Sequence, residues 1–223
     1  MKIIAIEGID GSGKTHQFGL LKDHIANNGY KFLTLEFPNY KNIVGKEIGK
    51  FLSGEHSVSA NTLDPKSMAL WFTVDRKITF EANKKKLEDV DFLLLNRYTL
   101  SSAVYQVLRA EKEEQEELLS WILELEHKAM CLPEPDLYII LDVHTTVAQN
   151  NIDKKGKREY LKEKKKDVYE DSPALLKEAR NLYLKGAQLV AQAEVIACSD
   201  AKEMFQDQDI FAKIRDTIKP LLF

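Results

Sequence analysis

Continuous apolar runs mark the strands that this sequence predicts. Such runs begin the chain at 2–6 and recur at 92–95 and 137–143, and further strands are expected at 31–37, which stops at Pro38, and at 195–197. Runs without alternating polar residues are typical of strands that are covered on both faces, as in a parallel sheet. The sequence therefore predicts a parallel sheet with helices on both sides.

The segments between these runs have the length and polarity of helices. A first helix is expected at 16–28, after a glycine-rich turn. Longer helices are expected at 65–87, 101–130 and 174–193, and each is long enough to cross over a sheet between parallel strands. We therefore expect one α/β domain over residues 1–223, with a three-layer parallel sheet flanked by helices.

The composition is that of an ordinary globular protein. The 223 residues are 44% hydrophobic and 30% charged, and the formal net charge is -3. A slightly acidic chain has no general electrostatic attraction for nucleic acid or for an anionic membrane. We therefore expect neither as a partner, and any affinity for phosphate must come from a local site.

The cysteines and the amino terminus argue against further classes of protein. Cys131 and Cys198 are the only cysteines, and neither has a neighbour at the spacing of metal ligands. Glu7 comes too early for a secretory signal, and no apolar run approaches the ~18 residues of a membrane span. The sequence thus predicts a cytoplasmic protein without a disulfide framework or a zinc site.

A glycine-rich loop follows the first apolar run. Residues 8–15, GIDGSGKT, match the phosphate-binding pattern G-x-x-x-x-G-K-[ST] and stand between a predicted strand and a predicted helix. The glycines let backbone N–H groups point at phosphate oxygens, beside the positive end of the helix dipole. The residues expected to bind the phosphates of a nucleotide are Gly8, Asp10, Gly11, Ser12, Gly13, Lys14 and Thr15.

Lys14 and Thr15 have separate expected roles in this loop. Lys14 would neutralise charge on the β- and γ-phosphates, and the Thr15 hydroxyl would bind Mg²⁺. ATP and Mg²⁺ are therefore the expected donor and cofactor. The alternative is a chance glycine turn before a lysine, which seldom falls at the start of an α/β chain. The loop leaves the acceptor open, because ATPases, GTPases and small-molecule kinases share it.

Four further segments bear on the acceptor. They are Phe37-Pro38-Asn39-Tyr40, Trp71 to Arg76, Asn96 to Gln106 and Leu141-Asp142-Val143. In order and spacing, and with Glu7-Gly8-Ile9-Asp10-Gly11 in the loop, they resemble the thymidylate kinase family over most of the chain. The resemblance implies a P-loop nucleoside monophosphate kinase fold with a flexible lid near 150–171. It also implies a homodimer that transfers a phosphoryl group from ATP to dTMP, giving dTDP for dTTP synthesis.

The resemblance implies that side chains on two predicted helices bind the base. Phe72 would stack on thymine, and Arg76, one helical turn later, would bond to the base. Taken alone, Phe72 is better explained as a core residue and Arg76 as a surface residue, and the resemblance reverses this interpretation. It also places Ser102 and Gln106 where their side chains reach the pyrimidine edge.

Sugar and phosphate would be held nearer the glycine-rich loop. Arg97 follows an apolar run, so it stands at the carboxyl end of a strand, where open α/β sheets bind ligands. The resemblance assigns Arg97 to the acceptor phosphate, and it places Tyr105 under the deoxyribose, where it excludes a 2′-hydroxyl. Asp10 would accept from the 3′-hydroxyl, although it also suits a turn, and Tyr105 also suits a half-buried helix position. Phe37 and Tyr40 are expected to line the acceptor site.

The basic segment at 153–171 is the expected lid. The resembling family carries a catalytic arginine in the P-loop or in the lid, and the loop position holds Gly11 here. We therefore expect Arg158, the only arginine of the segment, to compensate charge on the transferred phosphoryl group. Glu170 is expected at the metal shell or the acceptor. The alternative is a solvated, lysine-rich helix without a catalytic role.

Asn96 departs from the family pattern, which has Asp-Arg-Tyr or Asp-Arg-His where this chain has Asn96-Arg97-Tyr98. An amide can still hydrogen-bond near Mg²⁺, but it is uncharged and a poor base. Because the attacking group is already a phosphate anion, we expect a slower kinase rather than an inactive one. The alternatives are another deoxynucleoside monophosphate kinase and a catalytically weakened nucleotide-binding module. The sequence does not separate dTMP from dUMP, which differ by one methyl group.

Overall fold

The computed structural model describes residues 1–55, 60, 62–154 and 173–222, and it arranges them around a parallel sheet. Within this part of the chain the sheet has five strands in the order β2-β3-β1-β4-β5, and each neighbouring pair is parallel. The strands are β1 (Lys2–Glu7), β2 (Phe32–Glu36), β3 (Phe92–Asn96), β4 (Leu137–Asp142) and β5 (Ala193–Ala197). The expected α/β class is confirmed.

The three central strands carry the most apolar part of the core. β1, β3 and β4 are buried along almost their whole length. Ile4 on β1 pairs with Leu94 on β3 and with Leu137 on β4, and all of these side chains are buried. Helices on both faces explain the continuous apolar sequence of these strands. Because the strands are parallel, the loops that follow them meet at one edge of the sheet.

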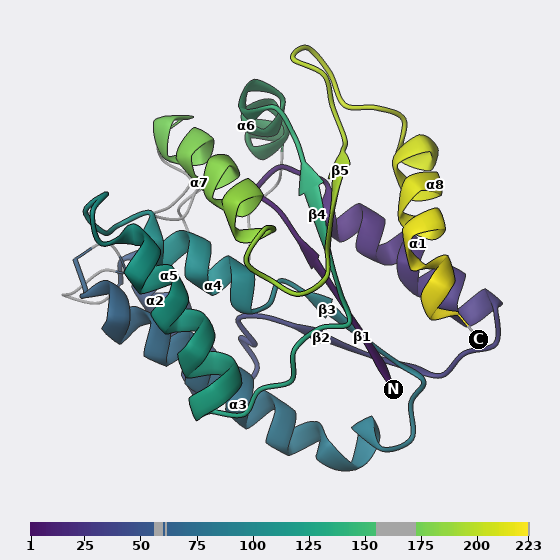
Figure 1. Ribbon diagram of the computed structural model, residues 1–223, viewed down its shortest axis with the longest axis horizontal. Coiled ribbons are helices and arrows are strands. Elements are labelled where there is room, and N and C mark those ends of the chain that lie inside the picture. The colour runs from purple at the N-terminus through teal and green to yellow at the C-terminus, as the bar shows by residue number, and fades with distance from the viewer. Residues whose placement is uncertain (56–59, 61, 155–172, 223) are drawn as a thin grey trace.

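Helices cover both faces of the sheet (Figure 1). On one face, α1 (Lys14–Asn27) packs beside α8 (Asp207–Ile218). The other face carries α3 (Pro65–Leu87), α4 (Thr99–Val107), α5 (Gln115–Glu124) and α7 (Pro173–Gly186), with α2 (Ile43–Ser53) against α3. This is the expected three-layer arrangement. Among the described residues, no helix is long and apolar enough to cross a membrane.

The single helix expected at 101–130 is wrong. α4 ends at Val107, α5 begins at Gln115, and a π-helix follows at Leu125–Ala129. After α4 the backbone N–H of Arg109 donates to the carbonyl three residues earlier, which tightens the last turn. Two carboxylates in the first turn of α5 then favour a new helix start, because they face the positive end of its dipole.

Three helices were not expected from the sequence: α2, α8 and α6 (Thr145–Lys154). Each spans about three turns, so its apolar face repeats too few times to give a clear period, and packing against the rest of the protein stabilises it. α2 also has a local start signal, because the Asn42 side chain accepts from the Gly45 N–H at 2.7 Å. The predicted helix at 174–193 ends earlier, at Gly186.

Candidate active site

A pocket of about 320 Å³ opens at the sheet edge where β1 and β3 end. Its lining combines the glycine-rich loop with side chains from the loop after β2, from α3 and from α4. The lining residues that the sequence predicted are Asp10, Ser12, Gly13, Lys14, Thr15, Phe37, Tyr40, Phe72, Arg76, Asn96, Arg97, Ser102, Tyr105 and Gln106. The fold therefore brings nearly all of the predicted donor and acceptor residues to one cavity.

The loop after β1 has the backbone that a phosphate-binding loop requires. Gly8, Gly11 and Gly13 have φ angles of 141°, 79° and 83°, a region that glycine adopts without strain. Lys14 begins α1, and its Nζ donates to the carbonyls of Gly8 at 2.8 Å and Ile9 at 2.7 Å. The loop itself thus holds the ammonium at the amino terminus of α1, where a phosphate group would bind.

Gly11 is enclosed by the helix that leads toward the predicted lid. A Cβ atom at this position would overlap the backbone carbonyl of Ala148 on α6. The Asn151 side chain, also on α6, donates from Nδ2 to the Gly11 carbonyl at 2.9 Å. The loop therefore has no room for an arginine at position 11 unless α6 moves, which gives a structural reason for glycine at this position.

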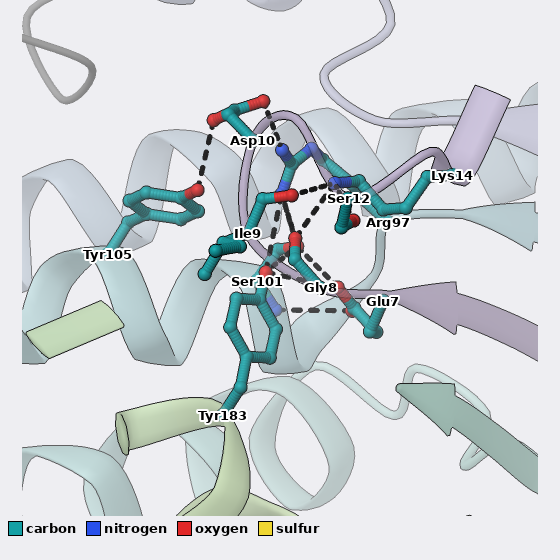
Figure 2. A network of polar contacts seen from close by, with 10 residues as sticks. All are labelled: Glu7, Gly8, Ile9, Asp10, Ser12, Lys14, Arg97, Ser101, Tyr105 and Tyr183. Carbon is teal, nitrogen blue, oxygen red and sulfur yellow. Dashed lines mark hydrogen bonds and ion pairs between the residues drawn. The ribbon is translucent and has the colours of Figure 1, made fainter. Parts of the chain in front are cut away.

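Arg97 stands at the centre of a polar network directly after β3 (Figure 2). Its backbone is left-handed, with φ of 63°, which is uncommon for a residue other than glycine and turns the chain sharply into α4. Nη2 pairs with Asp10 Oδ1 at 2.7 Å, and Nη1 donates to Ser101 Oγ at 3.1 Å and to the Tyr183 hydroxyl at 3.3 Å. Burial alone would lower the pKa of Arg97, but the charge of Asp10 and the other oxygens nearby raise it well above its ordinary value.

Glu7 is a buried carboxylate whose role was not predicted from the sequence. It lies on β1 and accepts from the backbone N–H groups of Tyr98 at 2.8 Å and Ser101 at 3.2 Å. The Ser101 hydroxyl donates to it at 2.5 Å, and the Tyr183 hydroxyl donates at 3.3 Å. Glu7 thus satisfies the start of α4 and holds two of the oxygens that contact Arg97, as Figure 2 shows.

Asp10 links Arg97 to Tyr105. Its Oδ1 pairs with the Arg97 guanidinium, and its Oδ2 accepts from the Tyr105 hydroxyl at 3.0 Å. The guanidinium carbon also lies 5.5 Å from the centre of the Tyr105 ring, in a cation–π arrangement. Three residues predicted to contact the acceptor therefore organise one another, whereas the predicted contact of Asp10 with a sugar hydroxyl stays a prediction.

At the opposite end of the pocket, Arg76 is buried rather than solvated. Only 1% of its surface is exposed, so the surface position suggested by the residue alone is wrong. Its Nε donates to Glu126 Oε2 at 2.8 Å, its Nη2 donates to Glu126 Oε1, and Thr73 donates to the same carboxylate at 3.0 Å. Burial opposes the charge of Arg76, but Glu126 outweighs it and raises the pKa of the guanidinium.

Glu126 was not found from the sequence, and no local signal points to it. It lies 50 residues from Arg76, in the π-helix of a segment that was expected to be regular helix. Phe72, one turn before Arg76 on α3, lines the pocket with 9% of its surface exposed. The structure thus gives this end of the pocket an aromatic ring beside a neutralised guanidinium.

Two polar side chains of α4 complete that end. Ser102 and Gln106 line the pocket one helical turn apart and are 3% and 0% exposed. Ser102 Oγ and Gln106 Nε2 are buried and have no hydrogen-bond partner among the residues that the structure describes. Buried polar atoms normally have a hydrogen-bond partner in protein or water, so these two atoms are free to bond to a polar group of a ligand that enters this end of the pocket.

Thr15 and Asn96 are the residues that suit Mg²⁺. The Thr15 side chain is exposed at the start of α1, Asn96 ends β3, and both line the pocket. In the described part of the chain, no group of three or more His, Cys, Asp or Glu residues could hold a metal ion. One hydroxyl and one amide oxygen still fit this ion, because Mg²⁺ in kinases takes most of its ligands from phosphates and water.

The predicted lid residues Arg158 and Glu170 lie outside the described residues, as does most of the segment at 150–171. Of this segment, the structure describes only the residues up to Lys154, the exposed last residue of α6. Assignments for this segment therefore stay predictions.

Comparison with known proteins agrees with this site. A family model described as thymidylate kinase matches residues 6–195. A thymidylate kinase of Caldicellulosiruptor saccharolyticus is 30% identical over 226 residues, which cover 99% of this chain and 97% of that protein. One of Mycobacterium tuberculosis is 29% identical over 191 residues, covering 85% and 86% of the two chains.

A solved structure of thymidylate kinase from Candida albicans has a TM-score of 0.72 to this chain at 18% identity, covering 98% of this chain and 91% of the other, so the fold is shared. Neither the family model nor these relatives support the alternatives of another monophosphate kinase or a weakened binding module. The chain belongs to the thymidylate kinase family.

Proposed function

We propose that the pocket at the ends of β1 and β3 is where this chain binds dTMP and the phosphates of ATP. As a thymidylate kinase, the chain is an ATP-dependent phosphotransferase that acts on dTMP. The observation that carries the assignment to this pocket is its division into two ends. A phosphate-binding loop and Arg97 form one end, and the other end consists of Phe72 and buried polar atoms that have no hydrogen-bond partner among the described residues.

At the phosphate end, the loop and Lys14 bind the donor phosphates, and Arg97 binds the acceptor phosphate. Phosphoryl transfer depends mainly on alignment and on compensation of charge at the moving group. Lys14 and Arg97 both line the pocket, so both supply positive charge to it. Mg²⁺ bound through Thr15, with Asn96 nearby, would neutralise further phosphate charge. Arg158 from the lid segment is proposed to complete this set.

At the base end, thymine stacks on Phe72 while its polar edge meets Arg76, Ser102 and Gln106. All of these side chains line one pocket. Tyr105 packs beneath the deoxyribose, and its hydroxyl is already held by Asp10 at 3.0 Å. A tyrosine fixed in this way leaves little room for a 2′-hydroxyl, so a deoxynucleotide is the preferred acceptor.

A homodimer and a cytoplasmic location complete the proposal. Leu70 and Ile78 are exposed at 42% and 40%, and two exposed apolar side chains on one helix, α3, suit a subunit contact. Light scattering after size-exclusion chromatography measures the mass directly. A mass near one chain rather than two would remove the dimer from the proposal.

The test of the function is an ADP-release assay with ATP and Mg²⁺. The acceptors to compare are dTMP, dUMP, dCMP, dGMP, the ribose analogue of dTMP, and thymidine, all at equal concentration. We expect clear preference for dTMP, and little activity with the ribose analogue. Equal rates with all deoxynucleotides would contradict the proposed base site, and absence of turnover with dTMP would contradict the function.

The role of Asn96 needs a separate measurement. An aspartate at this position adds a charge that Mg²⁺ or its water can use, so Asn96→Asp is expected to raise kcat by several-fold. Thr15→Val removes the proposed hydroxyl ligand and should raise the Mg²⁺ concentration needed for half-maximal rate. An Asn96→Asp variant without a gain in kcat would show that the amide is no handicap.

A further inference from the structure

Arg109 lies just beyond α4, one layer behind the base end of the pocket. Its Nη1 donates to Gln106 Oε1 at 2.9 Å, and its Nη2 donates to the backbone carbonyl of Leu63. Gln106 is completely buried and lines the pocket. Arg109 therefore contacts a side chain of the proposed base site without belonging to the site itself.

This contact decides which end of the Gln106 amide is available to a ligand. A guanidinium has only donors, so it can pair only with the amide oxygen. The amide nitrogen then faces away from Arg109, and Gln106 Nε2 is buried without a hydrogen-bond partner in the described part of the chain. If the amide were reversed, its N–H₂ group would face the N–H groups of Arg109. The electrostatics thus allow one orientation of this amide.

We propose that Arg109 is a specificity-determining positioning residue, which holds the Gln106 amide so that it donates to a carbonyl of the acceptor base. The proposal rests on the proposed function and names how its base site selects. Thymine and uracil have carbonyl groups on both sides of an N–H group, whereas cytosine has an amino group in place of one carbonyl. An amino group facing Gln106 Nε2 would leave two donors opposed and unsatisfied.

Ser102 does not provide the same discrimination. A hydroxyl both donates and accepts, so it can rotate to suit a carbonyl or an amino group. The Gln106 amide presents only its donor end while Arg109 holds the oxygen. Ser102 Oγ and Gln106 Nε2 both lack a hydrogen-bond partner among the described residues. Of these two groups, only the Gln106 amide is fixed as a donor before a ligand binds.

The second contact of Arg109 ties this donor to the helix that carries the aromatic face. Leu63 precedes Asp64, whose side chain caps α3 by accepting from the Ser67 N–H at 2.8 Å. Phe72 lies further along the same helix and lines the same pocket. One guanidinium thus connects the start of α3 with the end of α4, and it keeps donor and stacking surface in register.

A clamp between two helices is the competing explanation for Arg109. A clamp would affect stability and would weaken all acceptors to the same extent. A positioning residue acts through Gln106, so its loss should affect the acceptor that uses the Gln106 donor and should depend on that side chain being present. The two explanations therefore differ in kinetics.

The first experiment is Arg109→Met in the full-length chain, with kcat and KM measured for dTMP and dCMP. We expect KM for dTMP to rise about tenfold with kcat changed less than twofold, and the dTMP over dCMP preference in kcat/KM to fall about tenfold. Lys112→Met, an exposed residue three positions later, is the matched control. Equal losses for both acceptors would overturn the proposal.

The second experiment repeats Arg109→Met in a Gln106→Leu background. Residues that act as one unit are not additive, so the rise in KM caused by Arg109→Met should shrink to less than twofold when Gln106 is absent. The same tenfold rise in both backgrounds would overturn the proposal and would favour the clamp.

A third variant keeps the contact that the first removes. Gln106→Glu leaves an oxygen for Arg109 and turns the end that faces the pocket from a donor into an acceptor. It should raise KM for dTMP at least tenfold while dCMP is unaffected or improved, and unchanged preference would overturn the proposal even if Arg109→Met fails to fold. A wild-type protein without turnover of dTMP would instead overturn the proposed function, and this inference with it.

Discussion

Each end of the pocket holds an arginine paired with a carboxylate, but the two ends differ in how the chain brings the pair together and in their other polar groups. At the phosphate end, short segments that follow β1 and β3 place Asp10 and Arg97 together, and the ionised groups already pair with each other at 2.7 Å. At the base end, the ion pair of Arg76 and Glu126 joins helical segments 50 residues apart. Beside it, Ser102 and Gln106 keep buried polar atoms without partners among the described residues.

The difference fits the group that each end is proposed to bind. A phosphate carries its own charge, and its hydrogen bonds to an arginine or to N–H groups are strong enough to replace internal partners such as Asp10. A pyrimidine base is neutral and forms weaker bonds, so exchanging one neutral partner for another would bring little affinity. A donor that has no internal hydrogen bond to lose gains more free energy when it bonds to the base.

Removal of Arg97 is the strongest test of the phosphate end. Arg97→Met should lower kcat/KM for dTMP about a thousandfold, ~4 kcal/mol, because charge compensation is lost at the acceptor phosphate. Steady-state kinetics measures the loss, and Arg215→Met, at an exposed position on α8, is the matched control. A loss below tenfold would mean that Arg97 does not bind the acceptor phosphate.

Breaking the buried pair tests the base end. Glu126→Gln leaves the Arg76 charge buried without a carboxylate, so the free energy of unfolding should fall by ~3 kcal/mol. Thermal denaturation should show a Tm lower by about 6–12 °C. Asp136→Asn is the control, because its pair with Lys2 is 29% and 40% exposed and should contribute at most ~1 kcal/mol. Similar Tm values for both variants would contradict the distinction.

Removal of the Tyr183 hydroxyl tests whether α7 helps to position Arg97 and Ser101 at the phosphate end. Tyr183→Phe removes bonds to Ser101 Oγ at 2.8 Å and to Arg97 at 3.3 Å, and it should raise KM for dTMP about fivefold, ~1 kcal/mol. Tyr138→Phe is the matched control, since this buried hydroxyl bonds to Thr99 Oγ1 at 2.6 Å away from the pocket lining. An equal change of KM in both variants would argue against a specific role of Tyr183.

The smallest expected effect concerns Asp75, beside Arg76 on α3. Burial raises its pKa, and hydrogen bonds from the Asn39 N–H at 2.8 Å and Asn42 Nδ2 at 2.6 Å oppose the rise only in part. A raised pKa in the folded state contributes stability below the unfolded pKa of about 3.9, and this contribution is lost as pH rises through the folded pKa.

Relative to wild type, Asp75→Asn should therefore become more favourable as pH rises from about 4 toward neutral. The free energy of unfolding of Asp75→Asn should be lower than that of wild type, because the amide has one oxygen whereas the two oxygens of Asp75 each accept a hydrogen bond. Chemical denaturation of both proteins across this pH range gives the difference in unfolding free energy. A difference that does not change with pH would show that the pKa of Asp75 is not raised.

The phosphate end could be predicted well because its information is local. The glycine pattern of residues 8–15 and Arg97 directly after an apolar run both mark the carboxyl ends of strands. Parallel strands of one sheet place such ends at the same side of the sheet, and the strand order then makes β1 and β3 neighbours. Glu7 was adjacent to this pattern, but its role depends on bonds to Tyr98 and Ser101, which appear only in the folded chain.

The sequence by itself determined the class of the fold and the phosphate-binding loop, and through resemblance it predicted the residues that are proposed to surround the base. Only the tertiary structure decided how the charge of Arg76 is neutralised and how the Gln106 amide is oriented at the base end. Glu126 neutralises Arg76 from a π-helix, and Arg109 orients Gln106 because the chain turns after Val107. Strands can be predicted from the sequence because their apolar pattern repeats within a few residues. The partner of a charge buried between distant helices cannot be predicted in this way, because it depends on how the helices pack and not on spacing in the sequence.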